Sequence, residues 1–372
     1  MPAHFFGRDE LIGRVREALS DEYSPDRVLF FTGNRGCGKT ALLERLSQLA
    51  KAEHWFVVDV HSSRAVADMT SRIAGAGASF EVSLAPRLSL PGGASLSMGD
   101  ARVRDAHPTD LTDALLARCK TLGNTRGVYL AIDEIQKIPE TDMEQICAAV
   151  QMARRKGLPV ALMMAGLPGS KELVSSYGGC TFMQRVREVQ MGSLRISETT
   201  DAFSKLLALV PNMEVGEGVV WELSSYSQGY PYLMQLLGYS LVEYLSQLYP
   251  VGVRVARVDH VVDIEDEAYG AYRRDVLIPS SRKVGQEGLS YLGAMAQLLD
   301  DEGCAATGEV AKLLNKELSQ LSSARQMLIR RRLIQMAGRG KVRFALPHLS
   351  RFVLEGEEVQ SYSNDPDTWA IM

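Results

Sequence analysis

A glycine-rich stretch near the N-terminus ends in a lysine and a threonine, a pattern suited to phosphate chemistry. The stretch GNRGCGKT, residues 33–40, has the spacing Gly-x-x-x-x-Gly-Lys-Ser/Thr. In this pattern backbone N–H groups surround phosphates, the lysine reaches the β and γ phosphates, and the hydroxyl coordinates Mg²⁺. ATP and Mg²⁺ are therefore the predicted ligands, with Lys39 also catalytic and Thr40 a metal ligand. The nucleotide-binding residues predicted in this loop, called the P-loop below, are Gly33, Asn34, Arg35, Gly36, Cys37, Gly38, Lys39, Thr40 and Ala41.

Two adjacent carboxylates follow an apolar run farther along the chain, in VYLAIDEIQ. Because the run has the character of a buried strand, Asp133 and Glu134 are expected at its tip. In ATPases with such a loop, the first acid holds Mg²⁺ and the second orients or deprotonates the attacking water. We therefore predict Asp133 as a metal ligand and Glu134 as a catalytic residue.

The elements that would position these groups alternate between strands and helices. This alternation is typical of an α/β fold, here a P-loop NTPase core with a parallel sheet. The segment 75–100 breaks the rhythm. Its period of two between Pro and Gly residues predicts an inserted β-hairpin, with a flexible loop as the alternative. Strands are predicted over 27–32, 55–60, 127–133 and 159–166, and helices over 41–51, 109–122 and 142–156.

The second half of the chain changes character at about Ile196. Four amphipathic stretches predict a small helical bundle. The region that follows reads as three helices and two short strands, the pattern of a winged helix. The predicted domains are 1–195 for the ATPase core, 196–283 for the helical lid, 284–354 for the winged helix and 355–372 for an acidic tail.

The charge of the C-terminal region indicates a polyanionic partner. Between Val284 and Leu354, ten Lys and Arg oppose six Asp and Glu, which gives +4 in a chain whose net charge is -4. No acidic residue lies between Leu318 and Leu354. Double-stranded DNA is therefore the predicted partner, although a winged helix also serves as a protein-docking module. The predicted DNA contacts are Gln320, Ser322, Ser323, Arg325 and Arg330 on the third helix and Arg339, Lys341 and Arg343 on the wing.

The composition argues for a globular protein away from membranes. A length of 372 residues predicts two or three domains. No apolar run approaches the roughly 20 residues of a membrane span. The N-terminus carries charges where a signal peptide is apolar, so we expect a cytoplasmic protein without a membrane partner. The five cysteines never form a CxxC pair, which argues against structural zinc and a disulfide framework.

The two chemical motifs together resemble a known superfamily. GNRGCGKT with LAIDEI is similar to the AAA+ and related STAND P-loop ATPases, over roughly Phe5 to Leu354. The segment HFFGRDELIGRVREAL resembles the origin-recognition and archaeal-type branch, in which it lies beside the adenine. This resemblance implies that Phe6, Gly7 and Arg8 contact the nucleotide. It also implies a nucleotide contact at Pro231, where SQGYPYLM resembles the helix start of STAND relatives.

The resemblance further implies a role for a neighbouring subunit. TFMQRVREVQ resembles the segment in which AAA+ proteins carry an arginine finger, a cation that reaches the γ-phosphate of an adjacent site. Arg185 is the first candidate and Arg187 the second, with a surface salt bridge as the alternative. An ATP-dependent oligomer follows from this reading. The fourth strand ends in MMAGLPG without a polar sensor residue, and the lid lacks the usual sensor arginine, so we expect slow hydrolysis.

These observations define one function and two alternatives. The expected function is an ATP-dependent, DNA-binding switch or initiator-type assembly factor that serves replication, transposition, plasmid maintenance or phage defence. The first alternative is a signalling switch whose winged helix docks a protein effector. The second is a transcription regulator that works without nucleotide.

Overall fold

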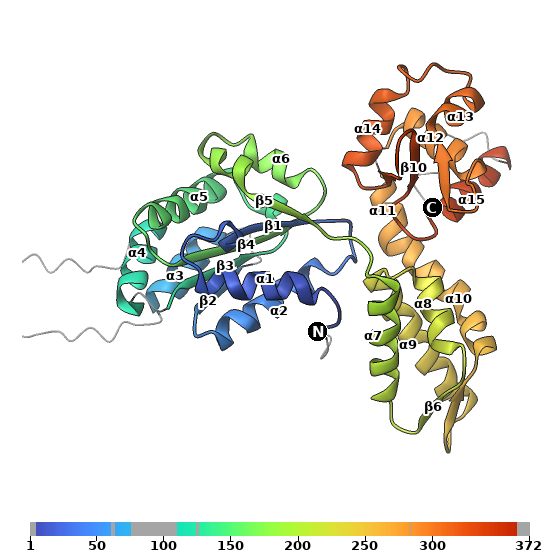
Figure 1. The fold of residues 1–372 in the computed structure, drawn as a ribbon, viewed down its shortest axis with the longest axis horizontal. Coiled ribbons are helices and arrows are strands. Elements are labelled where there is room, and N and C mark those ends of the chain that lie inside the picture. Colours follow the sequence, from blue (N-terminus) through green and yellow to red (C-terminus); the bar gives the residue numbers. More distant parts are fainter. Residues whose placement is uncertain (1–4, 61–63, 76–109, 124–125, 283, 363–372) are drawn as a thin grey trace, which may run out of the picture.

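The computed structural model describes residues 5–60, 64–75, 110–123, 126–282 and 284–362. An α/β core (residues 5–195) is followed by a helical unit (196–281) and by a C-terminal unit (284–362) of helices around a small sheet (Figure 1). Among the described residues, none of the helices combines the length and the apolar character that a membrane span requires. The hairpin predicted over 75–100 lies outside the described residues except for Gly75, which is the last residue of a helix.

The core is a parallel five-stranded sheet in the order β2-β3-β4-β1-β5. The side chains of β1, β3 and β4 are buried at every position, which explains why the sequence shows uninterrupted apolar runs there. The prediction of an α/β fold with a parallel sheet is confirmed. The strands are β1 Val28–Thr32, β2 Phe56–Val60, β3 Val128–Ile132, β4 Val160–Gly166 and β5 Arg187–Gln190.

Helices cover both faces of this sheet. Leu29 and Phe31 on β1 face a cluster that continues into the helical and C-terminal units. Phe30 faces a second cluster, which contains the buried side of α3, α4 and α5. The alternation follows from the two-residue period of a strand. The core helices are α1 Asp9–Ser20, α2 Lys39–Ala52, α3 Ala65–Gly75, α4 Leu111–Leu122, α5 Glu140–Arg155 and α6 Ser170–Ser175.

The fifth strand was not predicted from the sequence. Among the described strands, β5 pairs with β1 alone and lies at the edge of the sheet, and its sequence REVQ contains a single apolar residue. Arg187 on this strand donates from Nη1 to Asp26 Oδ1 at 2.8 Å, and Asp26 also accepts from Arg14 Nη2 at 3.0 Å. Arg187, the second arginine-finger candidate, is therefore engaged in an ion pair within its own subunit.

The helical unit shares its interior with one face of the core. It contains α7 Ile196–Ala208, α8 Val219–Ser227, α9 Pro231–Leu248 and α10 Val258–Tyr272, and a π-helical turn (Arg273–Leu277) leads into α11 Ile278–Ser281. Two short strands, β6 Met213–Val215 and β7 Arg254–Ala256, pair in parallel at one end. The sequence did not predict this pair, because three residues are too few for a recognisable alternation.

The C-terminal unit begins with a helix, continues with a strand and two helices, and ends with two strands and a helix. Its sheet is antiparallel in the order β8-β10-β9, and β8 was not predicted. The last helix continues through Tyr362, into the segment predicted as an acidic tail. The elements are α12 Gln286–Gln297, β8 Cys304–Ala306, α13 Thr307–Leu313, α14 Ser322–Arg330, β9 Ile334–Met336, β10 Lys341–Phe344 and α15 Leu349–Tyr362.

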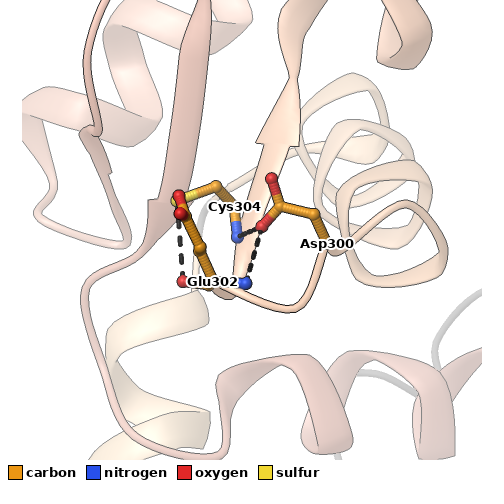
Figure 2. A group of neighbouring side chains, drawn as sticks. All are labelled: Asp300, Glu302 and Cys304. Carbon is orange, nitrogen blue, oxygen red and sulfur yellow. Dashed lines mark hydrogen bonds between the residues drawn. The ribbon is translucent and has the colours of Figure 1, made fainter.

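An aspartate closes the turn before β8 (Figure 2). Asp300 Oδ1 accepts from the backbone N–H of Glu302 at 3.0 Å and of Cys304 at 2.9 Å. Its other oxygen accepts from Lys341 Nζ at 2.8 Å, and these donors lower the pKa of the Asp300 carboxyl. Both oxygens therefore serve the turn and the neighbouring strand. Lys341, a predicted DNA contact, forms an ion pair with Asp300 here.

Candidate nucleotide site

The P-loop connects the end of β1 to the start of α2. Gly36 and Gly38 have φ angles of 78° and 87°, which an L side chain rarely adopts. A Cβ atom on Gly36 would lie 2.6 Å from the Cβ of Tyr232, so the helical unit also excludes any side chain there. The loop leads into α2 at Lys39, whose buried ammonium donates to the carbonyls of Gly33 at 2.8 Å and Asn34 at 3.0 Å.

Every carbonyl group from Gly33 to Gly38 accepts a hydrogen bond, and those of Arg35, Gly36 and Cys37 accept it from distant parts of the chain. This arrangement is expected of a backbone nest whose N–H groups receive phosphate oxygens, since the carbonyls then need partners on the opposite side. The donors are Lys39 Nζ for Gly33 and Asn34, Tyr230 Oη for Arg35, Tyr232 N for Gly36, Arg8 Nη2 for Cys37 and Leu42 N for Gly38.

Arg8 connects the N-terminal segment to the P-loop through hydrogen bonds. Its guanidinium donates to the carbonyls of Cys37 at 3.1 Å and Gly192 at 2.8 Å, and burial lowers its pKa. Its backbone N–H donates to Glu198 on α7 at 3.1 Å. The structure thus brings Arg8 to the predicted nucleotide pocket, where its guanidinium holds backbone carbonyls.

The predicted metal ligands lie in contact with each other. Thr40 Oγ1 donates to Asp133 Oδ2 at 2.5 Å, and Asp133 Oδ1 accepts from the N–H of Glu134 at 2.8 Å. Asp133 is buried at the end of β3. Mg²⁺ prefers oxygen ligands such as a hydroxyl and a carboxylate, so this pair fits the ion.

Glu134 begins a short 3₁₀ turn after β3 in a left-handed conformation, with φ of 53°. Its Oε2 atom accepts from Gln136 Nε2 at 2.7 Å and lies 3.5 Å from Lys137 Nζ. Glu134 and Lys137 both line the cavity above the P-loop. The place of Lys137 in the lining of this cavity was not predicted, because it depends on a turn that carries no distinct sequence signal.

A cavity of about 600 Å³ lies between the core and the helical unit, within the size range of small-molecule sites. One end is polar, where Gly36, Gly38, Lys39 and Thr40 meet Glu134. The other end is apolar and suits an adenine ring. The donor set and the two ends together fit ATP. The apolar lining is Phe5, Phe6, Leu194, Ala202, Leu206, Pro231 and Met234, and includes two residues predicted from the resemblance, Phe6 and Pro231.

Arg185 does not belong to this cavity. It is exposed and lines a separate cavity of about 430 Å³, together with Arg154, Arg155 and Arg187. The structure therefore does not bring Arg185 to the P-loop of its own subunit.

The predicted DNA contacts gather on and around α14 and the β9–β10 turn. Ser322 and Arg325 are half-buried on α14, where Ser323 and Arg330 are exposed. Gln320 lies just before this helix and accepts from the N–H of Glu317 at 2.8 Å. Arg339 is exposed in the turn and Arg343 is exposed on β10.

Comparisons with known proteins agree with this geometry. Residues 4–163 match the family model of the AAA ATPase domain, and residues 275–353 match that of a domain of unknown function, DUF8462. No curated protein matches the sequence. The ORC2 protein of Aeropyrum pernix, in its ADPNP-ADP complexes, superposes with a TM-score of 0.58 at 13% identity, over 98% of this chain and 97% of that one. The ADP form of the same protein gives 0.52 at 14% identity, over 98% and 96%.

The loop, the paired carboxylates and the family match over residues 4–163 are those of an AAA ATPase domain. The overall fold resembles that of the Aeropyrum pernix ORC2 protein. Lys39, Thr40, Asp133 and Glu134, which were predicted from their motifs, lie around one cavity or in direct contact with its lining.

Replacing Lys39 by alanine should weaken ATP binding by about tenfold or more, because the ammonium is the buried cation of the loop. Replacing Glu134 by glutamine should leave ATP binding within about threefold and lower hydrolysis by about 10²-fold or more, because the carboxylate predicted to act as general base is lost. A titration with a fluorescent ATP analogue and a phosphate-release assay measure both effects. Lys51→Ala, an exposed lysine on the same helix, is the matched control. Hydrolysis at the control's rate in either site variant would contradict this assignment.

Proposed function

We propose that this protein is a nucleotide-controlled, DNA-binding switch of the initiator type, in which the P-loop directly governs the C-terminal unit. One observation carries the proposal. The side chain of Asn34, in the P-loop, donates from Nδ2 to the backbone carbonyl of Arg332 at 2.7 Å. Arg332 lies between α14 and β9, so one hydrogen bond joins the nucleotide loop to the C-terminal unit.

A second contact supports the same connection. Arg332 Nη2 lies 3.6 Å from Glu188 Oε1 on β5, the strand next to β1. Asn34 is 8% exposed, so its hydrogen bond is largely shielded from water. We name the pair of contacts, Asn34 to Arg332 and Arg332 to Glu188, the latch.

Lys39 connects the latch to the nucleotide. The same Asn34 whose side chain holds Arg332 accepts from Lys39 Nζ through its backbone carbonyl. When Lys39 turns toward phosphate oxygens, it gives up this carbonyl and Asn34 is free to shift. Asn34 then loosens its hold on Arg332, which shifts the population of positions that the C-terminal unit adopts. Through this shift, ATP binding changes the affinity for DNA, and DNA binding changes the affinity for ATP.

The element order and charge of the C-terminal unit support DNA as the partner. Three helices and a three-stranded antiparallel sheet follow the order of a winged helix, with α14 as the third helix. Arg330 and Arg339 are exposed, and Arg325 is half-buried on α14. A basic surface of this kind binds the phosphate backbone. A protein effector on the same surface is the alternative.

Replacing Arg325, Arg330 and Arg339 together by alanine should weaken binding to double-stranded DNA by about tenfold or more at about 50 mM salt, because three cations leave the interface. Fluorescence anisotropy across a salt series measures the affinity and its slope. The matched control is the triple alanine variant of Lys51, Lys120 and Lys156, three exposed lysines of the core. Equal losses in the two triple variants, or negligible binding by the parent, would exclude DNA and favour the protein effector.

Asn34→Ala and Glu188→Ala should each raise DNA affinity without nucleotide toward the affinity that the parent shows with ATP, because the latch is broken. Glu188 does not line the nucleotide cavity, so Glu188→Ala should leave ATP affinity within about twofold. Fluorescence anisotropy measured with and without ATP gives the change in DNA affinity that ATP causes in each variant. Glu214→Ala, an exposed carboxylate on β6, is the control. Identical DNA affinities with and without ATP in the parent protein would exclude a nucleotide switch and favour the nucleotide-independent regulator.

We further propose that Arg185 acts on the site of an adjacent subunit in an ATP-dependent oligomer. Its exposure and its place in a cavity separate from that of its own P-loop support this role. Arg185→Ala should then bind ATP normally and hydrolyse it slowly, and mixing it with Glu134→Gln should restore part of the activity. Phosphate release from the mixed variants tests this, with Arg155→Ala, from the same cavity, as the control. A mixture no more active than its separate components would refute action between subunits.

A further inference from the structure

Gln136 lies two residues beyond the catalytic carboxylate and connects it to the neighbouring strand. Its Nε2 donates to Glu134 Oε2 at 2.7 Å. Its Oε1 accepts from the N–H of Leu167 at 3.3 Å and from Ser170 Oγ at 3.0 Å, just after β4. The donors and acceptors around the amide fit only one orientation, because the carboxylate can only accept and the N–H of Leu167 can only donate.

The end of β4 leaves room for this amide. A Cβ atom on Gly166 would lie 3.0 Å from Gln136 Oε1 and 2.9 Å from Ser170 Cβ. A side chain at position 166 would therefore displace the amide or the start of α6. The backbone of β4 and the hydroxyl of Ser170 together fix the amide oxygen, and the fixed amide presents its N–H to Glu134.

We infer that Gln136 is a positioning residue for ATP hydrolysis, which holds Glu134 as an oriented carboxylate. This inference rests on the assignment of Glu134 as the general base. With Oε2 held by Gln136, the second oxygen of Glu134 accepts the proton of the attacking water. The oxygen of that water forms the new bond to the γ-phosphorus, and the bond to the leaving ADP oxygen breaks.

Lys137 is a weaker support for the same carboxylate. Its Nζ lies 3.5 Å from Glu134 Oε2, and its side chain is 71% exposed. An exposed ion pair contributes little, because water screens it and the flexible side chain loses entropy. Gln136 does not line the nucleotide cavity, whereas Glu134 and Lys137 do. Gln136 therefore acts through Glu134 and leaves nucleotide binding to other residues.

The test is Gln136→Glu, which keeps the size of the side chain and an oxygen for Leu167 and Ser170 but replaces the donor facing Glu134 by an acceptor. Two carboxylates so close repel each other, so Glu134 is no longer held in the orientation that the amide donor fixes. We expect kcat to fall by about tenfold or more. KM and ATP affinity should stay within about twofold, since the cavity lining is intact.

Gln136→Leu and Ser170→Ala complete the experiment. Gln136→Leu should lower kcat less than Gln136→Glu does, because the donor to Glu134 is lost but no repelling charge is added. Ser170→Ala removes only one of the two donors to the amide oxygen and should have the smaller effect. Three outcomes would overturn the inference: an unchanged kcat in Gln136→Glu, a parallel loss of ATP affinity and kcat, or equal hydrolysis by the parent and Glu134→Gln. The last outcome removes the general base itself and leaves the DNA-binding proposal untouched.

Discussion

The backbone of the P-loop imposes the constraint on which the rest of the structure depends. A loop that offers its N–H groups to phosphate must find partners for its carbonyls elsewhere, because a buried carbonyl without a partner costs about 1–3 kcal/mol. The chain supplies these partners from distant segments: Arg8 before α1, and Tyr230 and Tyr232 at the start of α9. The N-terminal segment and the helical unit therefore form part of the loop's own hydrogen bonding. A change in the conformation of the loop must therefore alter the hydrogen bonds that hold the N-terminal segment and the helical unit.

The start of α9 shows how local chemistry meets this constraint. Pro231 occupies the first turn, where a missing N–H costs nothing, and the next residue, Tyr232, donates its N–H to Gly36. Tyr230 is 2% exposed and packs edge-on against Tyr272 with ring centroids 5.5 Å apart. Burial raises the pKa of the Tyr230 hydroxyl well above its ordinary value, so the group stays protonated and remains a donor to Arg35. The helical unit is thus bound to the loop by a donor that does not titrate near neutral pH.

The residues that the sequence revealed are those whose roles follow from local pattern. Lys39 and Thr40 belong to a motif whose spacing places them at the start of a helix, and Asp133 and Glu134 follow an apolar run that predicts a strand. β1, β3 and β4 are buried on both faces and read as apolar runs. β5 was not predicted from the sequence, because it is an edge strand and an edge strand needs no apolar run. The roles of Asn34 and Gln136 were not predicted for another reason. Each side chain bonds to a partner fixed only by the folded chain: Arg332, almost three hundred residues away, and Ser170 beyond the next strand.

The latch has a size that suits a switch. Coupling between two ligand sites usually amounts to about 1–3 kcal/mol, a change of about 5–150-fold in affinity. A shielded hydrogen bond such as that of Asn34 contributes about 0.5–1.5 kcal/mol, and leaving its partner unsatisfied costs somewhat more. One such bond, reinforced by the Arg332–Glu188 pair, would therefore reach the required range at the contact between the core and the C-terminal unit. Its rupture is enough to shift an equilibrium of this size, because a ligand shifts an equilibrium only by the difference in its affinities for the two states.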